Sequence, residues 1–113
     1  MAVINVYEQY FSAKAKFNGV TRKAALVTLV SDSSAGMIRY TAGVTFFPHR
    51  DEEDYAVSYD AYFEKVLYEG KGRRSKKKEE NFLKDFRKEI DEITQKEGGK
   101  VLWDKPLREA KYA

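Results

Sequence analysis

The 113-residue chain contains no cysteine, which excludes disulfide bonds, thiolate zinc sites and a cysteine nucleophile. A secreted domain of this size usually needs disulfides to support its limited core. The beginning of the chain also lacks a basic stretch followed by an apolar one, and no apolar run approaches the length of a membrane span. The sequence therefore predicts a cytoplasmic protein that makes no contact with a membrane.

Histidine is almost as scarce, since His49 is the only one in the chain. A metal site or a catalytic triad needs an imidazole close to suitable partners, whereas His49 stands just ahead of an acidic run that is typical of a solvated loop. No Gly-x-Ser-x-Gly motif occurs, and the Gly-Lys-Gly sequence at residues 70–72 lacks the spacing of a phosphate-binding P-loop. These absences predict a non-enzymatic protein with no cofactor and no metal site.

Proline is also rare, and the chain contains no repeat, low-complexity tract or linker-like stretch. Pro48 and Pro106 stand alone near the expected ends of structural elements. The length suits one hydrophobic core, and the 42% apolar and 14% aromatic content is ordinary for a globular protein. We expect a single domain over residues 1–113, with residues 104–113 as a possible C-terminal arm.

Alternating and β-branched residues predict strands in the first two thirds of the chain. Residues 20–31 and 37–47 are predicted to form a hairpin, because each shows strand-like patterning and a turn sequence lies between them. Residues 5–17 and 55–68 fit both a strand and a helix. The Asn-Gly turn at residues 18–19 and the tyrosine content of the later segment favour strands in both.

Residues 75–97 carry the clearest helical pattern. Ser75 is a suitable N-cap, apolar residues recur on one side, and two glycines follow. A short strand is expected at residues 101–103. The resulting fold class is α+β: an antiparallel four-stranded meander packed against one amphipathic α-helix, with a short C-terminal strand and an irregular arm.

The strongest functional clue is a run of six cations within residues 71–78, which we call the basic segment, in a chain whose net charge is only +3. Such density attracts phosphates, and a helix N-terminus offers free backbone N–H groups to the same anions. We therefore expect the basic segment to contact the phosphate backbone of nucleic acid, with further basic residues near the Asn-Gly turn as possible additional contacts. The predicted nucleic-acid-binding residues are Lys71, Arg73, Arg74, Lys76, Lys77 and Lys78, and the possible additions are Lys14, Lys16, Arg22 and Lys23.

The sequence leaves a second interpretation open, in which the protein is a protein-interaction module. It would act as a regulator, or as an inhibitor encoded by a phage or mobile element, on a host nucleic-acid-processing complex such as a defence ribonucleoprotein. The acidic run could imitate phosphate or dock on a basic cleft, and Trp103 could act as an anchor. The acidic run consists of Asp51, Glu52, Glu53 and Asp54. A free edge strand would also permit a homodimer.

Overall fold

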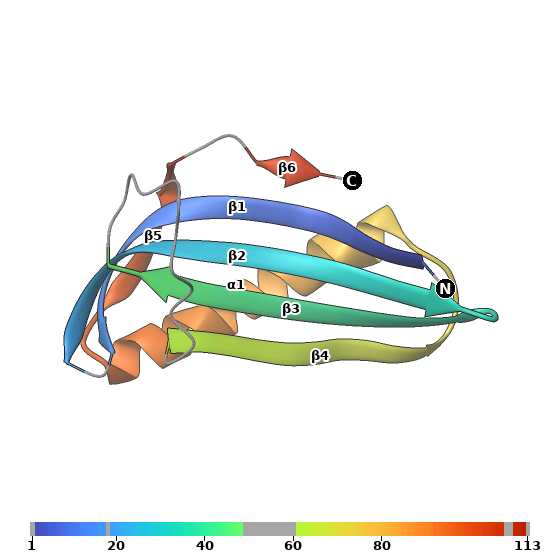
Figure 1. Ribbon diagram of the computed structural model, residues 1–113, viewed down its shortest axis with the longest axis horizontal. Helices are drawn as coiled ribbons and strands as arrows, with labels where there is room; N and C mark the ends of the chain where they lie inside the picture. The colour runs from blue at the N-terminus through green and yellow to red at the C-terminus, as the bar shows by residue number, and fades with distance from the viewer. Residues whose placement is uncertain (1, 18, 49–60, 108–109, 113) are drawn as a thin grey trace.

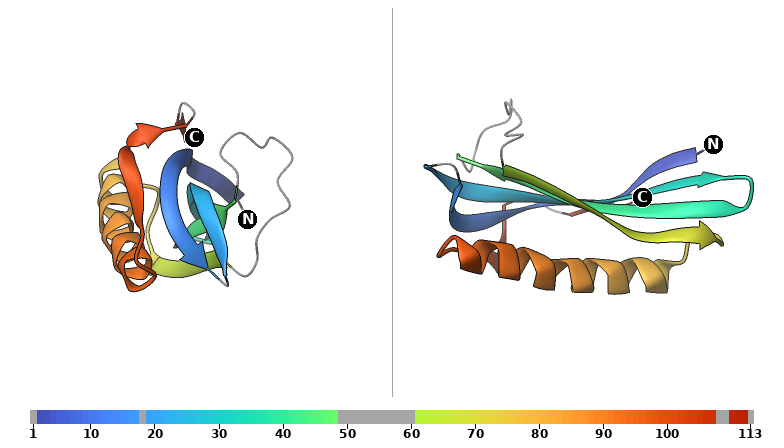
Figure 2. Two further views of the ribbon diagram at one scale, coloured as in Figure 1. Left: turned by 90° about the vertical axis from the view of Figure 1, so that its left-hand side faces the viewer. Right: turned by 90° about the horizontal axis from the view of Figure 1, so that it is seen from below.

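The structure is a computed structural model that describes residues 2–17, 19–48, 61–107 and 110–112. It consists of a six-stranded antiparallel sheet with one long helix lying along one of its faces (Figure 1; Figure 2). The elements in chain order are β1 (Ala2–Phe17), β2 (Val20–Ser34), β3 (Met37–Phe47), β4 (Tyr62–Lys71), α1 (Lys76–Lys96), β5 (Lys100–Pro106) and β6 (Lys111–Tyr112). The predicted α+β class is confirmed.

The strands follow the order β4-β3-β2-β1-β5, and the short β6 pairs with β1 beside β5. Strands β1 to β4 are therefore consecutive neighbours, as expected for the predicted meander. The ambiguous segment 5–17 is part of strand β1, and β1 starts earlier than expected, at Ala2. A strand is favoured here because β2 on one side and β5 and β6 on the other side hydrogen-bond to the β1 backbone.

Two expectations about strand boundaries need correction. Strand β4 begins at Tyr62 and continues to Lys71, whereas the sequence pattern predicted a strand over residues 55–68, of which 55–60 lie outside the described residues. The expected irregular arm is wrong in part, because β5 extends to Pro106 and β6 returns to pair Tyr112 with Tyr7. The chain thus supplies hydrogen-bond partners to a stretch of β1 that β5 does not reach.

The edges of the sheet bear on the predicted homodimer. Within the described ranges, no strand pairs with the outer edge of β4, so its backbone groups on that side have no strand neighbour. Val66 and Tyr62 on this strand are 47% and 41% exposed. A homodimer through this edge stays a prediction.

The hairpin turns depend on residues that accept a positive φ. Gly19, the glycine of the predicted Asn-Gly turn, has a φ of 77° between β1 and β2. In the β2–β3 turn, Ala35 and Gly36 both have positive φ, at 52° and 78°. Two successive positive values match the twist of the adjoining strands and permit a tight connection.

The core lies between α1 and the face of the sheet that carries Tyr40. Phe86 and Ile90 of the helix are 2% and 0% exposed, and the Phe82 ring lies 4.9 Å from the Tyr40 ring, centroid to centroid. The sheet contributes a continuous apolar surface, and each large side chain buried there adds roughly 1.5–3 kcal/mol through removal from water. Its large buried members include Phe11, Val27, Leu29, Tyr40, Val44 and Phe46.

The end of the helix is fixed by a close approach to β1. Gly98 has a φ of 69° where the chain leaves α1, as expected for the predicted glycine pair. A Cβ atom on Gly99 would collide with the carbonyl oxygen of Lys14 and with Ala15. Only glycine allows the backbone to enter β5 at this separation from β1.

Candidate nucleic-acid interface

The basic segment lies at one end of the elongated molecule, beside the β2–β3 turn (Figure 1). Lys71 is the last residue of β4, and the connection to α1 then folds back so that the Gly72 N–H donates to the Gly36 carbonyl at 3.1 Å. Gly72 has a φ of 145°, which favours glycine. The connection that carries the cations is thus attached to the sheet by its backbone.

The first turn of α1 begins where the sequence predicted it. Ser75 is the N-cap, with extended backbone angles, and its hydroxyl oxygen accepts a hydrogen bond from the Lys78 backbone N–H at 3.4 Å. Lys76, Lys77 and Lys78 therefore occupy the positive end of the helix dipole, where cations are unfavourable. Glu79 is the acidic residue of this turn and opposes that effect.

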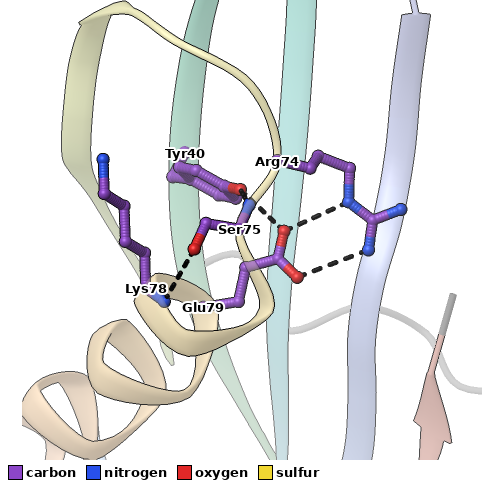
Figure 3. A network of polar contacts seen from close by, with 5 residues as sticks. All are labelled: Tyr40, Arg74, Ser75, Lys78 and Glu79. Carbon is purple, nitrogen blue, oxygen red and sulfur yellow. Dashed lines mark hydrogen bonds and ion pairs between the residues drawn. The ribbon is translucent and has the colours of Figure 1, made fainter.

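Glu79 is buried, and two side chains, Tyr40 and Arg74, hold its carboxylate at the start of the helix (Figure 3). The Tyr40 hydroxyl donates to Glu79 Oε2 at 2.6 Å, and the Arg74 guanidinium donates to both carboxylate oxygens, at 3.1 and 3.4 Å. The Ser75 N–H in turn donates to the Tyr40 hydroxyl at 3.2 Å. A carboxylate in the interior is stable only when paired and hydrogen-bonded in this way, so Arg74 has a structural role.

The pKa values of this network reflect its environment. Burial, and then the hydrogen bond to Glu79, raise the pKa of Tyr40 to about 12. The hydrogen bond to Glu79 raises the pKa of Arg74, so the guanidinium stays charged. The Arg74 and Glu79 charges therefore neutralise each other directly, and the neutral phenol of Tyr40 donates a further hydrogen bond to the same carboxylate.

Lys78 also has a partner within the fold. Its ammonium nitrogen lies 5.5 Å from the centroid of the Tyr68 ring, a cation–π contact, while the Tyr68 hydroxyl donates to the Lys71 carbonyl at 2.6 Å. Two of the six predicted cations, Arg74 and Lys78, are thus engaged by other side chains of this end of the molecule.

The remaining four cations are exposed. Within the part of the chain that the structure describes, the side chains of these residues form no ion pair or hydrogen bond, and the residues are Lys71, Arg73, Lys76 and Lys77. Their positive charges are concentrated around one helix start and face solvent. This arrangement suits a polyanion, because these cations can bind phosphates without first breaking an ion pair within the described chain.

A groove opens beside this cluster, between the first half of α1 and the strands β1 and β6. Its volume is about 750 Å³, and four of its ten lining residues are Lys or Arg, against two Glu. The lining residues are Val6, Tyr7, Arg74, Lys76, Glu79, Glu80, Leu83, Lys84, Arg87 and Tyr112. The groove is therefore continuous with the basic segment, since Arg74 and Lys76 belong to both.

One stripe of α1 forms the helical wall of the groove. Its members follow the i, i+3, i+4, i+7, i+8 and i+11 spacing that begins at Lys76 and ends at Arg87. The Arg87 guanidinium carbon lies 5.0 Å from the Trp103 ring centroid and 5.3 Å from that of Phe11. Arg87 is thus held over two rings at the inner end of the groove.

The opposite wall of the groove is aromatic. The Tyr7 and Tyr112 ring centroids lie 5.2 Å apart, with the rings tilted by 58°. Tyr7 is buried, its hydroxyl donates to Gln9 Oε1, and Tyr112 is 72% exposed. Burial raises the pKa of Tyr7, and the nearby Arg87 charge opposes that shift.

A β-bulge places two adjacent residues on this wall. The pairing of β1 with β2 shifts between Asn5 and Tyr7, which leaves Val6 as the extra residue. Both Val6 and Tyr7 are buried and line the groove, whereas adjacent side chains of a regular strand point to opposite faces.

The additional basic residues near the β1–β2 turn do not extend this surface. That turn and the β2–β3 turn lie at opposite ends of β2, in a molecule 43 Å long, so Lys14, Lys16 and Lys23 are distant from the basic segment (Figure 1). Arg22 is also not a surface residue. It is 2% exposed, and its guanidinium donates to the carbonyls of Phe46 and Phe17, both at 3.4 Å.

The residues expected to contact a protein partner have mixed outcomes. Asp51 to Asp54 lie outside the described residues. Trp103 is partly buried, packs edge-on against Phe11 at 4.9 Å and donates from Nε1 to Asp91 Oδ1 at 2.9 Å. Its ring is an internal support for Arg87 and Phe11 more than a free anchor.

The sequence interpretation missed the groove. The helical stripe that ends in Lys84 and Arg87 is readable from spacing, but those cations resemble ordinary surface residues until the opposite wall is known. The roles of Tyr7, Tyr112 and Glu79 follow from strand pairing and tertiary contacts between distant parts of the chain. No local sequence signal marks them.

Comparison of the chain with protein families, curated proteins and solved structures finds no match. Among the described residues, no three His, Asp or Glu side chains cluster as metal ligands. No helix in that part of the chain is both long and apolar enough to cross a membrane. The candidate function therefore rests on the geometry of the basic segment and the groove.

Proposed function

We propose that this protein is a non-enzymatic binding protein that grips the phosphate backbone of nucleic acid, or of a nucleic-acid-processing complex, through the basic segment. The observation that carries the proposal is the group of four exposed cations at the start of α1 that lack partners within the described chain. Phosphate contacts of this kind give affinity and position without base specificity.

The local electrostatics support a bound anion. Three lysines sit in the first turn of α1, where the helix dipole disfavours them, and one acidic residue, Glu79, is already neutralised by Arg74. A phosphate near the exposed amino groups would relieve this repulsion. Backbone N–H groups at the helix start add further donors for the same oxygen atoms.

The test is the salt dependence of nucleic-acid binding by two matched triple variants. The first variant combines Lys71→Gln, Arg73→Gln and Lys77→Gln, and the second changes Lys14, Lys16 and Lys23 to Gln at the opposite end of the sheet. Both lose three positive charges. We expect the slope of log K against log salt to flatten by about 2–3 in the first variant and by less than about 1 in the second.

Binding is measured by fluorescence anisotropy with a labelled oligonucleotide as single strand and as duplex. Equal losses in both variants would show that only net charge matters, and absence of binding to either probe in the unchanged protein would overturn the proposal. The proposal is supported if the salt slope flattens less in the distal variant than in the first variant, because the distal residues lie outside the proposed contact.

The alternative function is that of a regulator, or of a phage- or mobile-element-encoded inhibitor, of a host nucleic-acid-processing complex. A different feature, the outer edge of β4, supports this alternative. The outer edge of β4 has no strand neighbour in the described chain and carries the exposed Val66. A partner strand could pair there. A Val66→Lys change should abolish capture of such a partner and leave the salt dependence of oligonucleotide binding unchanged.

A further inference from the structure

We infer that the groove between α1 and β1/β6 is a binding site for one or two nucleotides of a single strand, with a base stacked on Tyr112 and phosphates held by Lys76 and Lys84. The inference rests on the proposed function and names the kind of nucleic acid and the second contact surface. It joins three observations: the volume of the groove, the exposed ring and the row of cations on the facing helix.

The volume selects the size of the ligand. About 750 Å³ lies within the range of roughly 300–1,000 Å³ that holds one small organic molecule. A base with its sugar and phosphate fits such a space. A duplex does not, because its stacked pairs present no free base face and are wider than the gap between a helix and a neighbouring strand.

The aromatic wall selects the flat part of the ligand. Tyr112 is 72% exposed, and its ring makes a tilted contact with the buried Tyr7 ring at a centroid distance of 5.2 Å. A ring supported on one side and open on the other is a stacking platform for an unpaired base. Burial of Tyr7 fixes the position of the platform.

The helical wall selects charge. Lys76, Lys84 and Arg87 follow one stripe of α1, and the 11 steps from the first to the last of them span about 16 Å at the rise of an α-helix. Lys76 and Lys84 are exposed and have no ion pair within the described ranges. A chain with regularly spaced phosphates can therefore run from the basic segment along this stripe.

Glu80 and Glu79 also line the groove, and their charges set a condition on the ligand. Glu79 is neutralised by Arg74, whereas Glu80, the other lining carboxylate, forms no ion pair with any residue that the structure describes. The cations still exceed the carboxylates by two, from four against two. The net field favours an anion, and the apolar contacts of Val6 and Leu83 favour one with a flat, weakly hydrated portion.

The experiment compares a dT homo-oligonucleotide, a duplex and poly-glutamate as fluorescent probes for four single variants. Tyr112→Ala should weaken single-strand binding by about 5- to 150-fold, the range for loss of one stacked base. Tyr112→Phe should stay within about 2-fold because the ring is kept. The matched control Tyr62→Ala removes another exposed tyrosine and should leave affinity unchanged, while Lys84→Gln should reduce the salt slope by about 0.7.

Occupancy of the groove has a separate readout. The chain has a single tryptophan, Trp103, and Arg87 bridges its ring to the groove. Single-strand binding should change Trp103 fluorescence in the unchanged protein and in the Lys71, Arg73 and Lys77 triple variant once saturated. Duplex and poly-glutamate should leave it unchanged.

The outcomes separate the two proposals. If oligonucleotide binding depends on the basic segment but is indifferent to Tyr112→Ala and Lys84→Gln, the groove inference is overturned and the proposed function stands. Poly-glutamate binding that depends on Tyr112 as strongly as dT binding also overturns it. If no nucleic acid binds the unchanged protein, the proposed function itself is overturned.

Discussion

The two ends of the sheet each carry a cluster of basic residues, and the two clusters differ in their burial and in their partners within the fold. At the β1–β2 end, Arg22 is buried and bonded to backbone carbonyls, and the neighbouring lysines are scattered over two strands. At the β2–β3 end, one arginine neutralises Glu79 while four cations surround the helix start without partners in the described chain.

The comparison shows that the environment of a cation, more than its place in a basic run, decides its role. Arg73 and Arg74 are adjacent in sequence and both are exposed, yet Arg74 pairs with the buried Glu79 and Arg73 has no ion pair among the described residues. Arg22, in the basic group near the β1–β2 turn, is the most buried cation among the described residues. Mutations at the two ends should therefore separate stability from binding.

The largest expected effect on stability is at Arg22. Arg22→Ala removes the donor to the Phe17 and Phe46 carbonyls and should lower the free energy of unfolding by about 2–4 kcal/mol. Lys23→Ala, one residue away and exposed, should change it by less than about 0.5 kcal/mol. Urea denaturation followed by circular dichroism gives both values, and similar losses in the two variants would contradict a structural role specific to Arg22.

The next effect is alkaline destabilisation through Tyr40. Its pKa is about 12 in the folded protein, against about 10 for an unfolded tyrosine, so unfolding releases a proton between these values. The stabilisation is complete below pH 10 and is lost as the pH rises to 12, a change of about 3 kcal/mol.

Tyr40→Phe should flatten the pH dependence of unfolding over that window. The control is Tyr62→Phe: the pKa of Tyr62 is also raised to about 12, but this side chain is 41% exposed and should contribute less. A Tyr40→Phe protein with an unchanged alkaline profile would contradict burial of an ionisable phenol at the helix start.

A smaller effect on stability than at Arg22 or Tyr40 is expected from Glu79→Gln, which keeps the shape of the side chain and removes its charge. Loss of the charge-assisted bonds from Arg74 and Tyr40 should cost about 1–2 kcal/mol in denaturant unfolding. The same change leaves Arg74 uncompensated, so affinity for single-stranded oligonucleotide should rise and its salt slope should steepen by up to about 0.7. Weaker binding with a normal fold would argue against phosphate contact at this end.

Much of the fold is predictable from sequence because its signals are local. Alternation predicted the hairpin strands, the Asn-Gly and Ala-Gly turns carried positive φ, and Ser75 predicted the start of the helix. The extension of β5 and the pairing of β6 were not predictable in this way. They depend on which stretch of β1 lacks a neighbour, and that is fixed only when the sheet assembles.

The candidate site likewise has a part that local sequence signals predicted and a part that depends on tertiary contacts. The density of positive charge predicted the basic segment, but composition could not distinguish Arg74 from Arg73. The difference arises because the folded chain places Glu79 between Arg74 and Tyr40 of β3. The groove could not be predicted from the sequence because its walls come from three separate segments, and the β1 residue Tyr7 and the α1 residue Lys84 are about seventy or more positions apart. Separation along the chain hides a site that strand pairing creates.

The bulge at Val6 has a consequence for how this chain could change over generations. The residues before and after it keep their partners on β2, Asn5 opposite Val30 and Tyr7 opposite Leu29. Deleting Val6 would leave both pairings in place and make the ladder regular, while the groove would lose part of its apolar wall. Val6 is also a buried core residue, so a one-codon deletion would reshape the groove and remove one core side chain in a lineage that keeps the strand pairing.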